Sequence, residues 1–379
     1  MARVVVVDAK WPRPGSDAAS QRTLQMIGEL ARLGFEIHLA ALFPDETGGE
    51  AGVPIELGAA ERVPIAGGQA LVDYLVRHAH EYDIAIVCWT RTAQVVLGPL
   101  RAANPDLVLV FDTLDVNHVR EYRHARVTGN ANLLRRALAM KAAELGAVAE
   151  ADITLAISAD DAATLRAGAP QARIEVVSMS VEQRMTPVPG PPGRSGAIYL
   201  GNYMACHNVD AATYLCHDIV PVIDVLGSAL PITLAGAGRH ELVDQLASER
   251  VTVAGYVDDI VALFDRQRMF AASLRVGSGI KGKLLAALSA GLPVVATHIA
   301  AEGVPLGDGH SALLADTARD FARACVRLEH DDDLWQELSA AGRAVVAQHF
   351  SAEVVREQVR AVFGRYLDGF PGQVSDGAG

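Results

Sequence analysis

A glycine-rich stretch with two interleaved lysines stands directly before a helix-like segment. Residues 275–297 read RVGSGIKGKLLAALSAGLPVVAT. Glycine has no Cβ, so its backbone N–H groups can approach a ligand closely. A helix N-terminus adds unpaired N–H groups and partial positive charge. The stretch therefore predicts an anion site, most simply for phosphate, formed by Arg275, Gly277, Ser278, Gly279, Lys281 and Lys283.

A P-loop is the first alternative for this stretch. Residues 277–283 fit its first seven positions, but the eighth is Leu284, where a P-loop has the Ser or Thr that holds Mg²⁺. A P-loop so late in the chain would also leave little room for the rest of such a domain. These residues therefore still indicate a phosphate site, but they disfavour a P-loop NTPase. The other alternative is an ordinary strand–turn–helix with basic residues facing solvent.

Alternating β-branched runs and helix-like segments predict two α/β domains in tandem, each a doubly wound parallel sheet. A proline- and glycine-rich stretch before residue 197 separates them. The predicted division is 1–186, a linker 187–196, 197–350, a final helix 351–369 that packs back on the first domain, and a tail 370–379. The predicted strands are Arg3–Asp8, Glu36–Leu42, Ile84–Cys88, Leu107–Asp112, Ile153–Ser158, Ile174–Ser178, Ala197–Leu200, Ile232–Ala235, Val251–Ala254, Met269–Leu274 and Leu292–Ala296.

Polar and glycine residues follow several of these strands, where such domains bind their ligands. After Leu107–Asp112 come a second acid, Asp115, and then His118, which we expect to face a cleft; a structural histidine is the alternative. In the first loop, Ser16 or Asp17 is suited to cap a helix. In the second half, the residues after the strands are Gly201, Asn202, Gly236, Gly255, Tyr256 and Val257.

Composition excludes several classes of protein. The 379 residues are 50% hydrophobic. A total of 33 basic and 45 acidic residues gives a net charge of -12, which disfavours a nucleic-acid binder.

The four cysteines form no CxxC pair, so reduced thiols in a cytoplasmic protein are expected. The N-terminal apolar run is too short for a signal peptide, and no apolar run is long enough to span a membrane. No residue cluster predicts a metal site; the run Asp331–Asp333 is expected to cap a helix.

Residues 118–141 reverse the overall charge, with six basic residues and a single acid, Glu121. A solvated basic face with internal ion pairs is one interpretation. The other is a patch for an anionic acceptor or for an anionic membrane surface, which would make the protein peripheral to the inner face of the membrane.

Together these motifs resemble glycosyltransferase family 4, the retaining group 1 nucleotide-sugar transferases of GT-B fold, over nearly the whole chain. The segment GLPVVAT at 291–297 and the following AEG at 301–303 are similar to the second domain of that family. The start of that domain is also similar, with Gly201, His207, Asn208 and Asp210, although one residue is missing between the histidine and the asparagine. Residues 112–121 resemble the first domain's Asp-x-x-Asp-x-His motif.

The resemblance implies two Rossmann-like domains facing a cleft, a nucleoside-diphosphate sugar as donor and a hydroxyl compound as acceptor, with an anionic or lipid-linked acceptor left open. It implies no cofactor and no metal. His118 would approach the transferred sugar, and Arg275 and Lys283 would neutralise the diphosphate. The remaining donor residues would be Gly201, Asn202, Gly236, Tyr256, Val257, Gly277, Ser278, Gly279, Lys281, Glu302 and Gly303. The acceptor residues would be Gly15, Ser16, Asp17, Asp112, Asp115 and Arg120.

The sequence differs from the family's motifs at two places that bear on the implied binding residues. The family often has two glutamates spaced by seven residues, the second of which binds the ribose, but Ser278 and Ala286 occupy those positions. Glu302 is the expected substitute. The first loop also keeps only Gly15 of the family's usual glycine pair. A non-catalytic GT-B scaffold that partners an active enzyme therefore remains the main alternative, and another GT-B enzyme, such as an epimerase or phosphorylase, is a further one.

Overall fold

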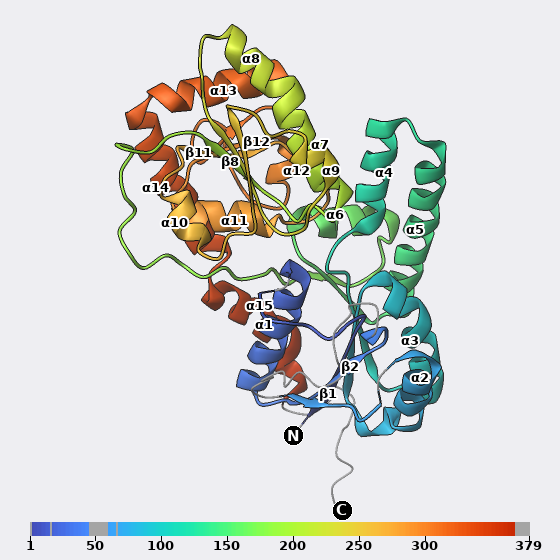
Figure 1. Ribbon diagram of the computed structural model, residues 1–379. Helices are drawn as coiled ribbons and strands as arrows, with labels where there is room; N and C mark the ends of the chain where they lie inside the picture. The colour runs from blue at the N-terminus through green and yellow to red at the C-terminus, as the bar shows by residue number, and fades with distance from the viewer. Residues whose placement is uncertain (1, 16, 45–59, 66, 368–379) are drawn as a thin grey trace, which may run out of the picture. The chain divides into compact units, whose positions relative to one another are not determined.

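The computed structural model describes residues 2–15, 17–44, 60–65 and 67–367 (Figure 1). They form two compact units, each of which has one parallel sheet with helices packed against it. The first unit comprises residues 1–118, 138–180 and 352–379, and the second comprises residues 119–137 and 181–351. Two doubly wound parallel sheets were predicted from the sequence, and this fold class is confirmed.

The first sheet has seven parallel strands in the order β3-β2-β1-β4-β5-β6-β7. The order reverses at β1, which pairs with β2 on one side and β4 on the other. Its central strands are buried on both faces, as their continuous Val and Ile runs require. The strands are β1 (Arg3–Asp8), β2 (Glu36–Ala41), β3 (Ala60–Arg62), β4 (Ile84–Cys88), β5 (Val108–Asp112), β6 (Ile153–Ala156) and β7 (Ile174–Val176).

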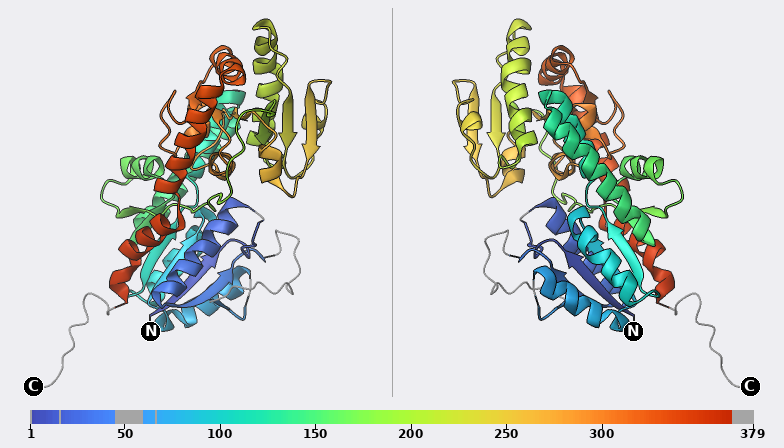
Figure 2. Two further views of the ribbon diagram at one scale, coloured as in Figure 1. Left: turned by 90° about the vertical axis from the view of Figure 1, so that its left-hand side faces the viewer. Right: turned by 90° about the vertical axis from the view of Figure 1, so that its right-hand side faces the viewer.

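Helices cover both faces of this sheet. The amphipathic α1 (Ala18–Leu33) begins at the Asp17 cap and ends at Gly34, whose φ of 97° suits glycine. It packs beside α15 (Ala352–Phe363) over one face, and both contribute to a core that includes Ile27 and Val359. Figure 2 shows α1 in blue on that face and α3 in cyan on the other. The other helices of the unit are α2 (Gly68–Arg77), α3 (Thr90–Ala103) and α6 (Ala159–Gly168), with short 3₁₀ turns at Ala79–Glu81 and Gly364–Tyr366.

The second sheet has six parallel strands in the order β10-β9-β8-β11-β12-β13, and its order reverses at β8. The strands are β8 (Ala197–Leu200), β9 (Ile232–Ala235), β10 (Val251–Gly255), β11 (Met269–Ala272), β12 (Val294–Ala296) and β13 (Leu313–Leu314). Its helices are α7 (Cys206–Tyr214), a π-helical turn (Leu215–Ile219), α8 (Val220–Val225), α9 (Glu241–Asp244), α10 (Ile260–Phe264), α11 (Gly282–Ser289), α12 (His298–Ala301), α13 (Ala318–His330) and α14 (Asp332–His349).

Two helices join residues of both units. The helix α4 (Asn117–Thr128) begins in the first unit, and from Val119 onward it counts with the second. The helix α5 (Ala131–Glu150) returns to the first unit from Leu138. The sequence did not indicate this exchange. In the part of the chain that is described, no helix combines the length and apolar character needed to cross a bilayer.

The sequence missed the shortest elements and overextended some strands. The strands β3 and β13 have three and two residues, too few to show a periodic pattern. The predicted strand Met269–Leu274 ends at Ala272, and the predicted strand Ile174–Ser178 ends at Val176. The predicted capping role of the Asp331–Asp333 run is confirmed, since the Asp331 side chain accepts from the N–H of Leu334 at the start of α14.

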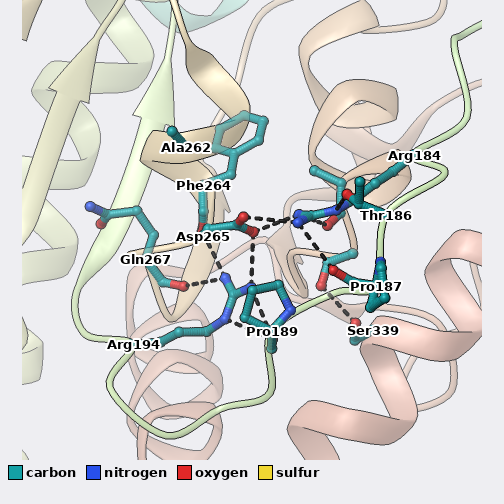
Figure 3. A network of polar contacts seen from close by, with 12 residues as sticks. Arg184, Thr186, Pro187, Pro189, Arg194, Ala262, Phe264, Asp265, Gln267 and Ser339 are labelled. Atoms are coloured by element: carbon teal, nitrogen blue, oxygen red, sulfur yellow. Dashed lines mark hydrogen bonds and ion pairs between the residues drawn. The ribbon is translucent and has the colours of Figure 1, made fainter.

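The proline-rich segment before β8 is held against the second unit by a network of polar contacts (Figure 3). Asp265, directly after α10, accepts from Nη1 of Arg184 at 2.6 Å and from Nη2 of Arg194 at 3.2 Å. Arg194 also donates to the carbonyl of Phe264 at 2.7 Å, and its side chain is almost completely buried. Although burial raises the pKa of Asp265, the hydrogen bond and charge of Arg184, with the charge of Arg194, bring that pKa below its ordinary value.

Asp265→Asn is expected to destabilise the second unit by about 1.5–3 kcal/mol at pH 7, because two guanidinium groups lose a charged acceptor. The lowered pKa means that the stabilisation is present at neutral pH and disappears as acid protonates Asp265. Urea unfolding at pH 7 and at pH 3 measures both effects. An equal difference between wild type and variant at the two pH values would contradict the assignment.

Candidate functional site

The glycine-rich stretch lies at the reversal point of the second sheet. Residues 273–281 follow β11, and Gly201 and Asn202 follow the neighbouring β8. In doubly wound sheets, ligands bind outside the carboxyl ends of the strands at this point. Gly279 has a φ of 62°, which a residue with a side chain rarely adopts, and no side chain caps the N-terminus of α11. The turn therefore brings uncapped helix N–H groups to the place where a ligand is expected.

Among the described residues, Lys283, in the first turn of α11, has only neutral oxygen partners for its ammonium group. It donates to the Tyr199 hydroxyl oxygen at 2.9 Å and to Oδ1 of Asn208. The Tyr199 hydroxyl in turn donates to Asn208 Oδ1 at 2.8 Å. Burial, with a smaller contribution from the charge of Lys281, lowers the pKa of Lys283 to about 7. The ammonium form of Lys283 therefore has no carboxylate partner among the described residues.

Further basic residues gather around the same lysine. The pKa of His207, at the start of α7, is lowered to about 4. Burial is the main cause, followed by the charges of Lys283, Arg120, Lys281 and His124. Such repulsion identifies a region of positive potential, which an anion would relieve. His207 and His124 are not among the predicted site residues; the resemblance gave only the position of His207, and no signal in the sequence pointed to His124.

Arg275 and Lys281 are engaged more fully than Lys283. Arg275 donates to Asp210 at 2.6 and 3.2 Å, and its guanidinium lies 4.3 Å from the centre of the Tyr214 ring. Lys281 donates to the carbonyl of Gly279 at 2.6 Å, which closes the glycine turn. The charge of Arg275 is thus already partly balanced by a carboxylate.

Glu302, the predicted substitute for the ribose-binding glutamate, is held by an arginine from α4. Arg123 donates to both of its carboxylate oxygens, at 2.6 and 2.8 Å, and also to the carbonyl of Gly277 at 2.6 Å. Burial raises the pKa of Glu302, but the Arg123 hydrogen bond and the charge of Lys281 lower it below its ordinary value. Arg123 therefore connects the glycine turn to the loop that begins at Glu302 and Gly303; the sequence gave no signal for this role.

A pocket of about 370 Å³ lies beside this region, at the carboxyl ends of β8, β9 and β10. Tyr203, Gly236 and Tyr256 line it, together with His240. Within the described part of the chain, the hydroxyl of Tyr203 and Nδ1 of His240 are buried and lack a hydrogen-bond partner. Buried polar atoms without partners are rare, so these two atoms point to a polar ligand or ordered water.

The glycines at these strand ends serve close packing of the backbone. A Cβ on Gly236 would lie 1.8 Å from the carbonyl oxygen of Gly201, so a side chain there would displace the β8 loop. Asn202 supports the same loop, since its Oδ1 accepts from the N–H of Met204 at 3.0 Å. Val257, after β10, is half-buried. Ser278 lies in the turn itself.

In the first unit, the polar residues near β5 are occupied in structural contacts. Asp112 is buried and accepts from Arg22 at 2.9 Å, which ties the end of β5 to α1. Nδ1 of the buried His118 lies 2.5 Å from Oε2 of Glu144, a residue that the sequence did not single out. Asp115, which lies between Asp112 and His118 in the sequence, is half-buried.

The first loop is exposed at Gly15, and Asp17 both caps α1 and pairs with Lys10 at 2.5 Å. Ser16 lies outside the described residues. Arg120 counts with the second unit, near His207. Among the residues that the structure describes, no group of three or more His, Cys, Asp or Glu residues is arranged to hold a metal ion.

Comparisons with known proteins give a family for part of the chain and a fold for the whole of it. The model of the family described as "Glycosyl transferases group 1" matches residues 194–331. A curated enzyme of Cutibacterium acnes, UDP-N-acetylglucosamine–N-acetylmuramyl-(pentapeptide) pyrophosphoryl-undecaprenol N-acetylglucosamine transferase, is 28% identical over 184 residues. This match covers 45% of the present chain and 44% of that enzyme, so it spans less than half the length of either.

Solved structures resemble the chain over nearly its whole length. Sucrose-phosphate synthase from Thermosynechococcus elongatus has a TM-score of 0.74 at 14% identity, over 97% of this chain and 100% of that one. Anabaena HepE, solved in complex with UDP-glucose, has a TM-score of 0.67 at 16% identity, over 96% and 99%. At such identities the likeness shows the fold alone. Residues 194–331 therefore match the group 1 glycosyltransferases, and the chain as a whole has the GT-B fold.

Proposed function

We propose that this chain transfers a sugar from a nucleoside diphosphate to a hydroxyl acceptor, with retention of anomeric configuration. The observation that carries the proposal is the uncompensated charge of Lys283 within a cationic cluster at the reversal point of the second sheet. Cleavage of the anomeric C–O bond places negative charge on the departing diphosphate. Lys283, Lys281, Arg275 and the Gly277–Gly279 turn would stabilise that charge, and one preorganised donor is worth roughly 3 kcal/mol in such a step.

The pocket beside this cluster is suited to the base and ribose of the nucleotide. Its lining residues include Tyr256, whose ring can stack on a base, and Tyr203 and His240, each of which has a buried polar atom without a partner among the described residues. Val257, Gly201, Asn202 and Gly236 belong to the same strand ends. Uridine is the base we favour, because HepE was solved with UDP-glucose and the Cutibacterium relative is named for a UDP-sugar.

The other site assignments follow the resemblance and complete the proposal. His118 contacts the transferred sugar. Glu302 and Gly303 contact the ribose. Because Arg123 already donates to both carboxylate oxygens of Glu302, that carboxylate must either bind Arg123 and the ribose together or give up its contact with Arg123. Gly15, Ser16, Asp17, Asp112, Asp115 and Arg120 remain the proposed acceptor residues, of which Asp112 would act through its ion pair with Arg22.

A second candidate function is a non-catalytic scaffold that assists an active glycosyltransferase. Ala286 favours it, since the family's ribose-binding glutamate is missing there. The retained Lys283, Arg275 and His118 favour an enzyme.

A peripheral site at the cytoplasmic face of a membrane is part of the proposal. Within residues 119–137, the large apolar side chains of Tyr122, Val127 and Leu134 are 45%, 41% and 39% exposed. Arg126 in α4, and Arg135 and Arg136 in α5, are exposed within the same residue range. Apolar side chains beside basic ones match the interface of an anionic bilayer.

UDP is expected to raise the thermal midpoint more than GDP or ADP, because a ligand that binds only the folded state stabilises it by RT ln(1 + [L]/Kd). Lys283→Ala should abolish the shift, and Lys141→Ala, the same change on the exposed face of α5, should leave it intact. Release of UDP from UDP-glucose then separates the two functions. Binding of UDP without any turnover of UDP-glucose would support the scaffold. If no nucleotide raises the thermal midpoint, the proposed diphosphate site and the proposed base and ribose pocket are both contradicted.

The affinity for UDP is expected to fall as pH rises from 7 to 9, by up to about tenfold per unit. Lys283 has a pKa of about 7 without ligand, and a bound diphosphate stabilises the ammonium form and raises that pKa. Calorimetry in buffers of different ionisation enthalpy should detect proton uptake near pH 8. Lys283→Arg, which keeps its charge over this range, is the control and should bind without proton uptake. An affinity of the wild type that is independent of pH would refute the role of Lys283.

Replacement of Tyr122, Val127 and Leu134 together by serine is expected to weaken retention on vesicles that contain anionic phospholipid. Val225→Ser, at a residue that is 86% exposed elsewhere in the second unit, provides the matched control. Sedimentation with anionic and with neutral vesicles measures the effect. Equal retention of the wild type on both kinds of vesicle would rule out this contact.

A further inference from the structure

His118 is held by a buried carboxylate that neither the sequence motifs nor the comparisons assign. Glu144 lies in α5, 26 residues further along the chain, and is only 1% exposed. Its Oε2 atom is 2.5 Å from Nδ1 of His118. Both residues belong to the first unit. A carboxylate only accepts hydrogen bonds, so Nδ1 of His118 carries the proton in this contact.

The same carboxylate also fixes the backbone on which His118 stands. Oε1 of Glu144 accepts from the N–H of Asn117 at 2.8 Å, and Oε2 accepts from the N–H of His118 at 3.3 Å. These are the first two residues of α4, whose unpaired N–H groups favour a negative charge. The Thr90 hydroxyl donates to Oε1 at 3.4 Å. Glu144 therefore controls both the position of the His118 Cα and the orientation of its ring.

These contacts leave a single nitrogen of His118 for chemistry. Nδ1 is directed to Glu144, and among the described residues no hydrogen bond to Nε2 is found. A histidine whose second nitrogen is fixed by a carboxylate has a defined tautomer and a defined ring plane, as in other sites where an outer partner orients a histidine.

We propose that Glu144 is a positioning residue for the transfer reaction, which acts through His118 by directing Nε2 toward the sugar. This inference rests on the proposed function, in which His118 contacts the transferred sugar. The competing explanation is that Glu144 only caps α4 and stabilises the fold.

A double-mutant cycle separates the two explanations. Glu144→Gln is expected to lower kcat/KM for sugar transfer or for hydrolysis of UDP-glucose by about 10- to 100-fold, mainly through kcat. The Kd of UDP should stay unchanged. In a His118→Ala background, the same substitution should cause no further loss, because Glu144 acts only through the imidazole. Equal losses in both backgrounds would overturn the proposal.

Two further variants show whether a loss of activity in Glu144→Gln comes from a damaged fold. Thr90→Val removes another donor to the same carboxylate and leaves the His118 contact in place, so kcat should remain near wild type. If Glu144→Gln does not fold, Glu144→Asp keeps the charge with a shorter reach and is expected to fold and to retain part of kcat. Full wild-type kcat with a lowered thermal midpoint in Glu144→Asp would indicate a cap alone and overturn the proposal.

A spectroscopic readout is independent of turnover. Nitrogen-15 NMR of the labelled protein is expected to show His118 with its proton on Nδ1, and Glu144→Gln should change this tautomer population. If no sugar nucleotide is turned over, the proposed function fails, and the NMR result still decides whether Glu144 orients the ring. An unchanged His118 spectrum in the variant would overturn the inference even in an active enzyme.

Discussion

The candidate site of the second unit is built on basic residues that lie close together around one glycine-rich turn. Lys281, Lys283, Arg120 and His124 all act on His207, and the pKa of both His207 and Lys283 is lowered as a result of burial and this repulsion. At neutral pH these lowered pKa values favour the uncharged form of His207 and, in part, that of Lys283, whereas a bound anion would favour the charged forms. A diphosphate at this position would turn an unfavourable interaction into a favourable one. This is the physical reason to connect the site with a nucleotide-sugar reaction.

The surrounding structure orients Lys283 without giving it a carboxylate partner among the described residues. Tyr199 and Asn208 offer Lys283 neutral oxygens, so the ammonium group is oriented but not paired with a carboxylate. The acidic residues nearby pair with other basic residues, Asp210 with Arg275, and Glu302 with Arg123 and, at 3.5 Å, with Lys281. The close approach of Gly236 to Gly201 keeps the β8 and β9 loops packed together beneath the pocket. Sheet topology places β8, which carries Tyr199, next to β11, which precedes the glycine turn, at the reversal point of the strand order.

The two sheets and the glycine turn could be predicted from the sequence, because they depend on local patterns of residues. The alternation of strands and helices predicted both sheets, and the glycines with Lys281 and Lys283 predicted the turn at the start of α11. Other features depend on contacts between distant residues, for which a single sequence has no signal. Glu144 and Arg123 reach their partners across 26 and 179 positions. The predicted site residue Asp112 was recognisable as a polar residue after a strand, but its ion pair with Arg22 was not.

The most direct test of the account is a calorimetric comparison of uridine, UMP and UDP with the purified protein at pH 7. If the cationic cluster is the main binding determinant, affinity should rise steeply with each phosphate, and added salt should weaken UDP far more than uridine. Uridine that binds as tightly as UDP would contradict the account, because the pocket beside β10 would then supply the affinity and the cluster around Lys283 would have no role in it.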